Sequence, residues 1–229
     1  MISHHGVTID IPELGRTSAI VYPAAADRRI GATFVFAHGA GAGQESGFMV
    51  AFAAALAARG LDVVTFNFLY VEQRKKIPDK TDRLEACFRA VIAAARDATP
   101  ANVIFIGGKS MGGRIASHLA AAGDDVRGLI LLGYPLHPPG KPDQLRIAHL
   151  PAINVPVLCL QGTRDPFGSP EELRPHLAKI PAAVTLHAVE QGDHSLARSR
   201  SKPVVGRTVE RTYSELQDLI AAWVSASVT

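Results

Sequence analysis

A serine flanked by glycines stands near the middle of the chain, in the segment GGKSMGG at residues 107–113. Gly108, Ser110 and Gly112 match the pattern G-x-S-x-G, in which a sharp turn between a strand and a helix holds a serine hydroxyl out of the sheet edge. We expect the flanking glycines to let the backbone turn this tightly. The pattern therefore predicts that Ser110 is a nucleophile.

A nucleophilic serine needs a base to take its proton and an acid to orient that base. Asp165 and His194 each follow an apolar run, at residues 157–161 and 184–189 respectively. Ser, Asp, His is the chain order of the triad in one large fold class of hydrolases. Taken alone, Asp165 could be a turn residue before a proline and His194 a plain loop histidine. We interpret the three together as a catalytic triad of Ser110, Asp165 and His194.

A glycine-rich turn, HGAGAG at residues 38–43, follows the apolar run 33–37. A tetrahedral intermediate needs two donors for its oxyanion, usually the amide after the nucleophile and one from a loop after an earlier strand. We predict that the amides of Met111 and Ala40 form this oxyanion hole. A flexible turn and a phosphate-binding loop are the alternatives. The segment lacks the glycine spacing and the following lysine that a phosphate-binding loop would have. The supporting residues of the turn are His38, Gly39 and Gly41.

The segments that carry this chemistry follow apolar runs, and these runs alternate with amphipathic stretches. The expected parallel strands are residues 33–37, 61–66, 103–106, 129–132, 157–161 and 184–189. Such an alternation predicts a mostly parallel α/β sheet with helices on both faces and function at the carboxyl ends of strands. An antiparallel pair, residues 7–11 and 17–22, is expected at one sheet edge. Capping boxes are predicted at residues 82–85 and 169–172, where helices should begin.

The composition fits one domain spanning residues 1–229 and argues against several other classes of protein. Hydrophobic residues make up 47% and charged residues 20%, which is typical of globular proteins. A net charge of +3 gives no broad basic field, so no nucleic-acid partner is expected. With no signal-peptide core and no apolar run of membrane-spanning length, we expect a cytoplasmic protein without a membrane partner. Its oligomeric state is left open.

Several other residues have plain interpretations. Cys87 and Cys159 are expected to be buried and unpaired, and neither has metal-ligand neighbours, so no cofactor or metal is predicted. The basic segments 74–76 and 198–202 are interpreted as solvated loops. Because the second follows His194 closely, an anionic substrate is the alternative for it. Lys109 stands beside the nucleophile, and the direction of its side chain is left open.

Five segments together resemble the small lidless α/β-hydrolase subfamily: HGAG at 38–41, FNF at 66–68, GGKSMGGR at 107–114, LQGTRDPFG at 160–168 and DHS at 193–195. Members include uncharacterised bacterial hydrolases, the testis-expressed hydrolase-like protein and a hydrolase-like subunit of the non-specific-lethal chromatin complex. The resemblance implies an α/β-hydrolase fold without a lid domain, and Ser110, Asp165 and His194 as the triad. Leu69 stands where this subfamily would carry proline, and the neighbouring dienelactone-hydrolase branch usually has cysteine in place of Ser110.

The predicted function is a serine hydrolase of carboxylesterase-like type that acts on a small-molecule acyl substrate through an acyl-enzyme. The residues do not choose among esters, thioesters and amides. The alternative is a non-catalytic binding or scaffold protein that keeps the fold, as the chromatin-associated members suggest. A scaffold has no need for a serine at a strained turn, so the triad favours the enzyme.

Overall fold

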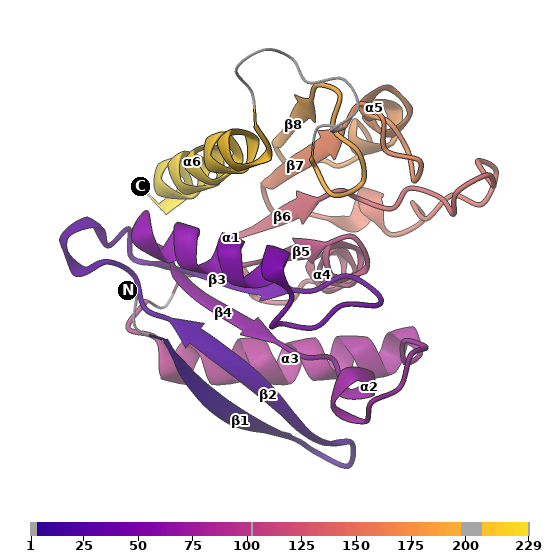
Figure 1. The fold of residues 1–229 in the computed structure, drawn as a ribbon. Coiled ribbons are helices and arrows are strands. Elements are labelled where there is room, and N and C mark those ends of the chain that lie inside the picture. The colour runs from indigo at the N-terminus through magenta and orange to yellow at the C-terminus, as the bar shows by residue number, and fades with distance from the viewer. Residues whose placement is uncertain (1–3, 102, 198–207, 229) are drawn as a thin grey trace.

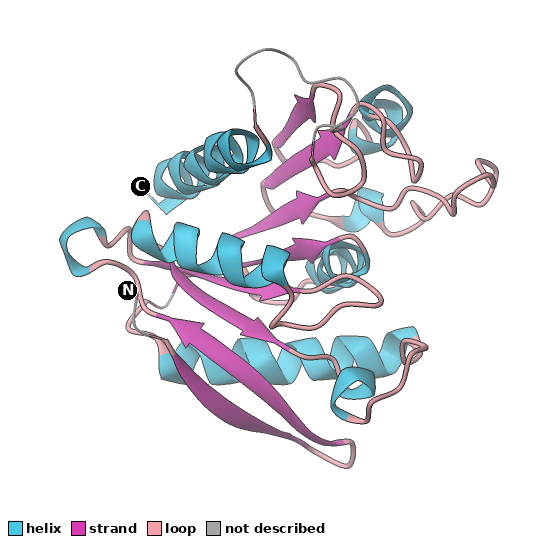
Figure 2. Ribbon diagram, viewed as in Figure 1, coloured by secondary structure: helices cyan, strands magenta, loops and turns pink. Residues whose placement is uncertain are grey.

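The computed structural model describes residues 4–101, 103–197 and 208–228, and it is built around one eight-stranded sheet (Figures 1 and 2). The strands are β1 His5–Ile11, β2 Gly15–Tyr22, β3 Ala32–Ala37, β4 Asp62–Phe66, β5 Val103–Lys109, β6 Gly128–Leu132, β7 Val157–Gly162 and β8 Val184–Val189. Their order across the sheet is β1-β2-β4-β3-β5-β6-β7-β8. Only β2 runs antiparallel to its neighbours, β1 and β4, and all other neighbouring strands are parallel.

Helices cover the sheet on both sides. They are α1 Gly47–Ala58, α2 Leu69–Glu72, α3 Thr81–Ala98, α4 Met111–Ala121, α5 Pro170–Leu177 and α6 Val209–Val228, with 3-10 turns η1 Ala26–Arg28 and η2 Leu150–Ala152. Helices α1 and α6 pack on one face, and α3 and α4 pack on the other (Figure 1). In the part of the chain that the structure describes, none of these helices combines the length and the apolar character needed to cross a bilayer.

Strand β3 illustrates why the central parallel strands are mainly apolar. Phe34 and Phe36 belong to the core beneath α1 and α6, whereas Val35 and Ala37 belong to the core beneath α3 and α4. All four are fully buried. Because successive strand residues point to opposite faces, a strand that is covered on both sides needs an unbroken apolar run. The predicted α/β fold with a mostly parallel sheet and an antiparallel edge is confirmed.

The two predicted capping boxes have different outcomes. At the start of α5, Ser169 Oγ accepts from the Glu172 amide at 3.3 Å, and Glu172 Oε2 accepts from the Ser169 amide at 2.7 Å. This box is confirmed. The box expected at residues 82–85 is wrong, because α3 begins earlier, with Lys80 as its N-cap and no side-chain capping bond. Asp82 lies inside the first turn instead, where its negative charge interacts favourably with the positive end of the helix dipole.

Two connections bear on the site. Residues 133–156, between β6 and β7, carry only the turn η2, so no lid domain is inserted there. Tyr134 Oη donates to the Arg146 carbonyl at 2.6 Å, and the Arg146 amide donates to Leu136 O at 2.8 Å, so this connection folds back on itself. Leu69, which replaces the expected proline, is the first residue of α2, a position that proline would also fit.

Candidate active site

The turn between β5 and α4 holds Ser110 in a backbone conformation that serine seldom adopts. Its φ is 52° and its ψ is −116°, and such conformations persist where the surrounding structure enforces them. The Ser110 amide donates to Leu132 O at the end of β6, at 3.0 Å, and the Ser110 carbonyl accepts from the Arg114 amide, also at 3.0 Å. Neighbours on both sides therefore fix this serine at the carboxyl end of β5.

The glycines beside Ser110 are required for space rather than for an unusual φ. A Cβ atom at Gly108, or one at Gly112, would lie 2.5 Å from the carbonyl oxygen of Ala37, the last residue of β3. Neither glycine has a positive φ, whereas Ser110 itself does. The need for glycine on both sides of Ser110 therefore comes from the space at this tight turn and not from a positive φ. These glycines instead let β5 and α4 approach the end of β3 closely.

His194 lies between Ser110 and Asp165, within hydrogen-bond distance of both. Its Nε2 is 2.8 Å from Ser110 Oγ, and its Nδ1 is 2.8 Å from Asp165 Oδ2. The Asp165 side chain is fully buried, and the His194 side chain is 22% exposed. When Nδ1 donates its proton to the carboxylate, Nε2 presents a lone pair to the serine hydroxyl. In this geometry His194 can accept the proton of the Ser110 hydroxyl. The resulting imidazolium then lies beside the buried Asp165 carboxylate.

Asp165 combines the turn role considered for it with the contact to His194. Its Oδ1 accepts from the Phe167 amide at 2.8 Å, which is turn chemistry. Its Oδ2 accepts from Gln161 Nε2 at 3.0 Å as well as from His194. The two interpretations of Asp165 are thus compatible, and three donors hold the carboxylate in one orientation.

Gln161 and Phe167 were not predicted as site residues. Gln161 is fully buried in β7, and its Nε2 also donates to Gly168 O at 2.7 Å. The Phe167 ring stacks on the His194 ring with centroids 4.1 Å apart. For Gln161 the available signal was a polar amide in an otherwise apolar strand, since a buried amide needs partners. For Phe167, no pattern in the sequence pointed to His194.

The glycine-rich turn after β3 lies against the serine turn. A Cβ at Gly39 would be 3.5 Å from Ser110 Cβ, and Gly41 has a φ of 74°. His38 is fully buried; its Nε2 accepts from the Phe68 amide at 3.1 Å, and burial lowers the pKa of this histidine. It is thus a packing residue that supports the turn.

The two predicted oxyanion donors lie beside the serine. Ala40 and Met111 both line a cavity with Ser110 and His194. Met111 is the first residue of α4, so its amide has no acceptor within the helix. The role of Ala40 and Met111 as oxyanion donors stays a prediction.

Two cavities meet at Ser110 and His194. The first, of about 310 Å³, has an apolar lining that includes Phe48, Met49 and Tyr213. We call it the apolar cavity. The second, of about 350 Å³, lies on the α4 side and is called the arginine cavity. Its lining residues are Ala40, Pro78, Asp79, Leu84, Ser110, Met111, Arg114, Pro135, Arg146, Phe167 and His194.

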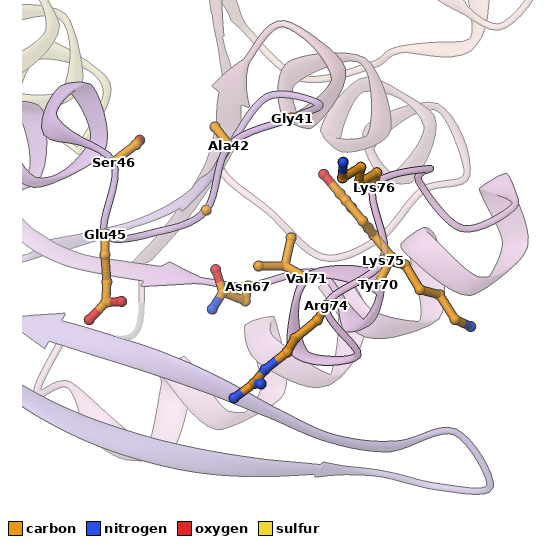
Figure 3. A pocket seen from close by; sticks show the side chains of 11 residues that line it. Gly41, Ala42, Glu45, Ser46, Asn67, Tyr70, Val71, Arg74, Lys75 and Lys76 are labelled. Atoms are coloured by element: carbon orange, nitrogen blue, oxygen red, sulfur yellow. The ribbon is translucent and has the colours of Figure 1, made fainter.

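The basic segment 74–76 lies at a separate hollow between the glycine-rich turn and α2, which Ser110 and His194 do not line. Its three side chains point in different directions (Figure 3). They do not converge on one point as donors to a single anion would. The other basic segment, 198–202, lies outside the described residues. Among the described residues there is no group of three or more His, Cys, Asp or Glu side chains suited to a metal ion.

Lys109 reaches the apolar cavity and was not predicted to do so. Its Nζ donates a short hydrogen bond to the His194 carbonyl oxygen. Burial lowers the pKa of Lys109 to about 8, against the opposing effect of Asp165 and Asp193. Alternation along β5 was the available signal, because Lys109 shares a strand face with Phe105, which packs in the core beneath α1 and α6.

Lys109→Met is expected to change how stability depends on pH. Since the folded-state pKa of about 8 lies below the usual 10.5, the unfolded chain binds this proton more tightly between those values. The burial cost of the ammonium is fully present below pH 8 and disappears as the pH rises towards 10.5. Wild-type stability relative to the variant should therefore rise with pH, by up to about 3 kcal/mol. Urea unfolding of both proteins between pH 7 and 11 measures this. Lys141→Met, in an exposed loop, is the matched control, and a difference independent of pH would contradict the expectation.

Comparisons with known proteins extend over nearly the whole chain. A family model described as an alpha/beta hydrolase domain matches residues 30–225. An α/β serine hydrolase without a lid from Xanthomonas campestris is 22% identical, with 97% of this chain and 96% of that chain covered and a TM-score of 0.73. An α/β serine hydrolase homologue from Coxiella burnetii is 19% identical, with coverages of 96% and 97% and a TM-score of 0.75. A dienelactone hydrolase from Anabaena variabilis is 17% identical, with 96% of each chain covered and a TM-score of 0.73. At these identities the likeness is one of fold.

Proposed function

We propose that this chain, which belongs to the alpha/beta hydrolase domain family, is a serine hydrolase that cleaves an ester or related acyl bond of a small molecule. The observation that carries the proposal is the hydrogen-bonded series from Ser110 through His194 to Asp165, with 2.8 Å at each step. Within the family, the five sequence motifs support the lidless subfamily that includes the testis-expressed and chromatin-complex members. The dienelactone-hydrolase branch usually has a cysteine nucleophile, so the serine at position 110 favours the lidless subfamily over that branch.

The geometry supports a two-step acyl transfer. Ser110 Oγ attacks the acyl carbon while His194 Nε2 takes the hydroxyl proton, and the Asp165 carboxylate stabilises the imidazolium. The amides of Ala40 and Met111 donate to the oxyanion. Collapse breaks the acyl bond, the leaving group takes the proton from His194, and an acyl group is left on Ser110. His194 then activates a water that hydrolyses the acyl-enzyme and restores the serine.

Labelling with a fluorophosphonate probe tests this proposal, because the probe reacts with an activated serine. The wild-type protein should form an adduct that peptide mass spectrometry maps to Ser110, and Ser110→Ala should not. Ser46→Ala is the control, since Ser46 lines the apolar cavity without being the proposed nucleophile. A folded wild type that does not react, or a Ser110→Ala variant that reacts equally, overturns the proposal. A stoichiometric partner retained by Ser110→Ala, with no ester hydrolysis, would favour the scaffold alternative.

A further inference from the structure

We propose that the arginine cavity binds an anionic group of the substrate. The preferred substrate is then an acyl compound with a carboxylate or phosphate on one side of the scissile bond and an apolar group on the other. This inference rests on the proposed function, because the cavity opens at Ser110 and His194. Arg114 and Arg146 both line this cavity, and each carries a guanidinium group that can bind an anion.

Arg114 and Arg146 come from different elements and reach the same cavity. Arg114 lies in the first turn of α4, directly after the serine turn, and Arg146 lies in the connection between β6 and β7. Arg146 Nη1 donates to a backbone carbonyl, that of Pro135, at 3.2 Å. In the part of the chain that the structure describes, the Arg114 guanidinium makes no hydrogen bond or ion pair. Other arginines do pair with carboxylates: Arg29 with Asp62, Arg59 with Asp218 and Arg89 with Asp124.

The two guanidinium groups are close enough to affect each other. Burial, and then the charge of Arg114, lowers the pKa of Arg146. Like charges that are partly buried near each other cost free energy unless an opposite charge joins them. A guanidinium presents paired N–H donors that match carboxylate and phosphate oxygens. A bound anion would therefore relieve the repulsion and supply the missing acceptors.

Among the described residues that line the arginine cavity, Asp79 carries the one carboxylate. Its Oδ1 lies 3.5 Å from Arg83 Nε, so a third arginine opposes its charge. Its Oδ2 is buried without a hydrogen-bond partner. With the Asp79 charge opposed by Arg83, the lining keeps a positive balance from Arg114 and Arg146.

The apolar cavity also opens at Ser110 and is the proposed site of the apolar group of the substrate. Phe48, Met49 and Tyr213 line it and suit an apolar arm of the substrate. Lys109 is the cation in that lining, and its Nζ already donates to the His194 carbonyl. The two cavities therefore differ in character, and a substrate whose scissile bond lies at Ser110 would place one arm in each.

Matched pairs of esters test the preference. The first pair places the charge on the acyl side: para-nitrophenyl hemiglutarate against its neutral methyl ester. The second pair places it on the alcohol side: para-carboxyphenyl butanoate against its methyl ester. In the wild type, kcat/KM for the anionic member of one pair should exceed that of its neutral partner by about 10-fold or more, as expected for charge-assisted hydrogen bonds. The pair that shows the preference identifies the arm.

Variants of both arginines test which groups cause the preference. Arg114→Gln and Arg146→Gln should each reduce the anionic-to-neutral ratio by about 10-fold. Arg114→Lys and Arg146→Lys should keep part of it, because the charge remains without the planar fork. Arg16→Gln, at an exposed ion pair with Asp10 on the edge hairpin, is the control. Ratios near one in both pairs, or ratios unchanged in both glutamine variants, would overturn the inference.

A binding measurement separates this inference from the proposed hydrolase activity. Calorimetric titration of Ser110→Ala with monomethyl glutarate and with inorganic phosphate needs no turnover. One of the two should bind at a single site, and Arg146→Gln in the same background should remove it. If the wild-type protein labels at Ser110 but shows no ester preference, or if neither anion binds, the arginine cavity proposal fails alone. If Ser110 does not label, the hydrolase proposal fails, and the titration still decides whether the cavity takes an anion.

Discussion

Asp165→Asn should lower kcat for ester hydrolysis by about 10³- to 10⁴-fold while the fold is kept. The carboxylate of Asp165 receives donors from His194, Gln161 and the Phe167 amide. Asparagine has a single side-chain oxygen, so its amide group must face one of these donors. If the NH₂ group of the new asparagine faces His194, it donates to Nδ1, and the imidazole proton must then be on Nε2. The imidazole then has no lone pair for the Ser110 hydroxyl.

Asp193→Asn is the matched control for this substitution. The exposed Asp193 carboxylate accepts from the amides of Ser195 and Ala197, at 2.7 and 3.3 Å, and lies next to His194 in the chain. Its loss should reduce kcat by less than about 10-fold, since surface substitutions usually have small effects. Steady-state kinetics with a chromogenic ester, together with thermal unfolding, measures both variants. If Asp165→Asn kept kcat within tenfold of the wild type, Asp165 would be a turn residue only.

The strands could be predicted closely where burial on both faces demands an apolar run. The exception is β5, expected at residues 103–106 and observed over Val103–Lys109. Gly107 and Gly108 continue the strand and pair with Ile130 and Leu131 of β6. Glycine is a weak signal for a strand, so the apolar run predicts a strand that ends before these two residues. The extension brings Lys109 into the sheet and aims it at the apolar cavity.

Some residues of the candidate site could be predicted from local sequence patterns, whereas others are placed by tertiary contacts. Ser110, Asp165 and His194 follow strand ends in recognisable motifs, so their convergence could be predicted from the order of the chain. Arg146 has no such pattern around it. Its position depends on the hydrogen bonds that fold its connection back on itself, including the one from Tyr134 Oη. Spacing in the sequence carries no information about a contact of this kind, and the arginine cavity was therefore not predicted.

Gly112→Ala is expected to reduce the free energy of unfolding by about 3 kcal/mol or more, because the added methyl group meets backbone rather than a movable side chain. The new Cβ would lie 2.5 Å from Ala37 O and 2.6 Å from His38 O. Either the start of α4 or the end of β3 must shift to make room. Urea unfolding of the wild type and the variant measures the loss.

Gly47→Ala is the matched control, because it also adds one methyl group to the first turn of a helix. Nothing lies within 4 Å of the Cβ position at Gly47, so its effect should stay within about 1 kcal/mol. Similar stabilities for the two variants would contradict the close packing of the serine turn against β3. The contact that crowds Gly112 also holds the turn bearing Ala40 beside Ser110. Gly112→Ala should therefore lose hydrolytic activity even at temperatures where it is fully folded, whereas Gly47→Ala should not.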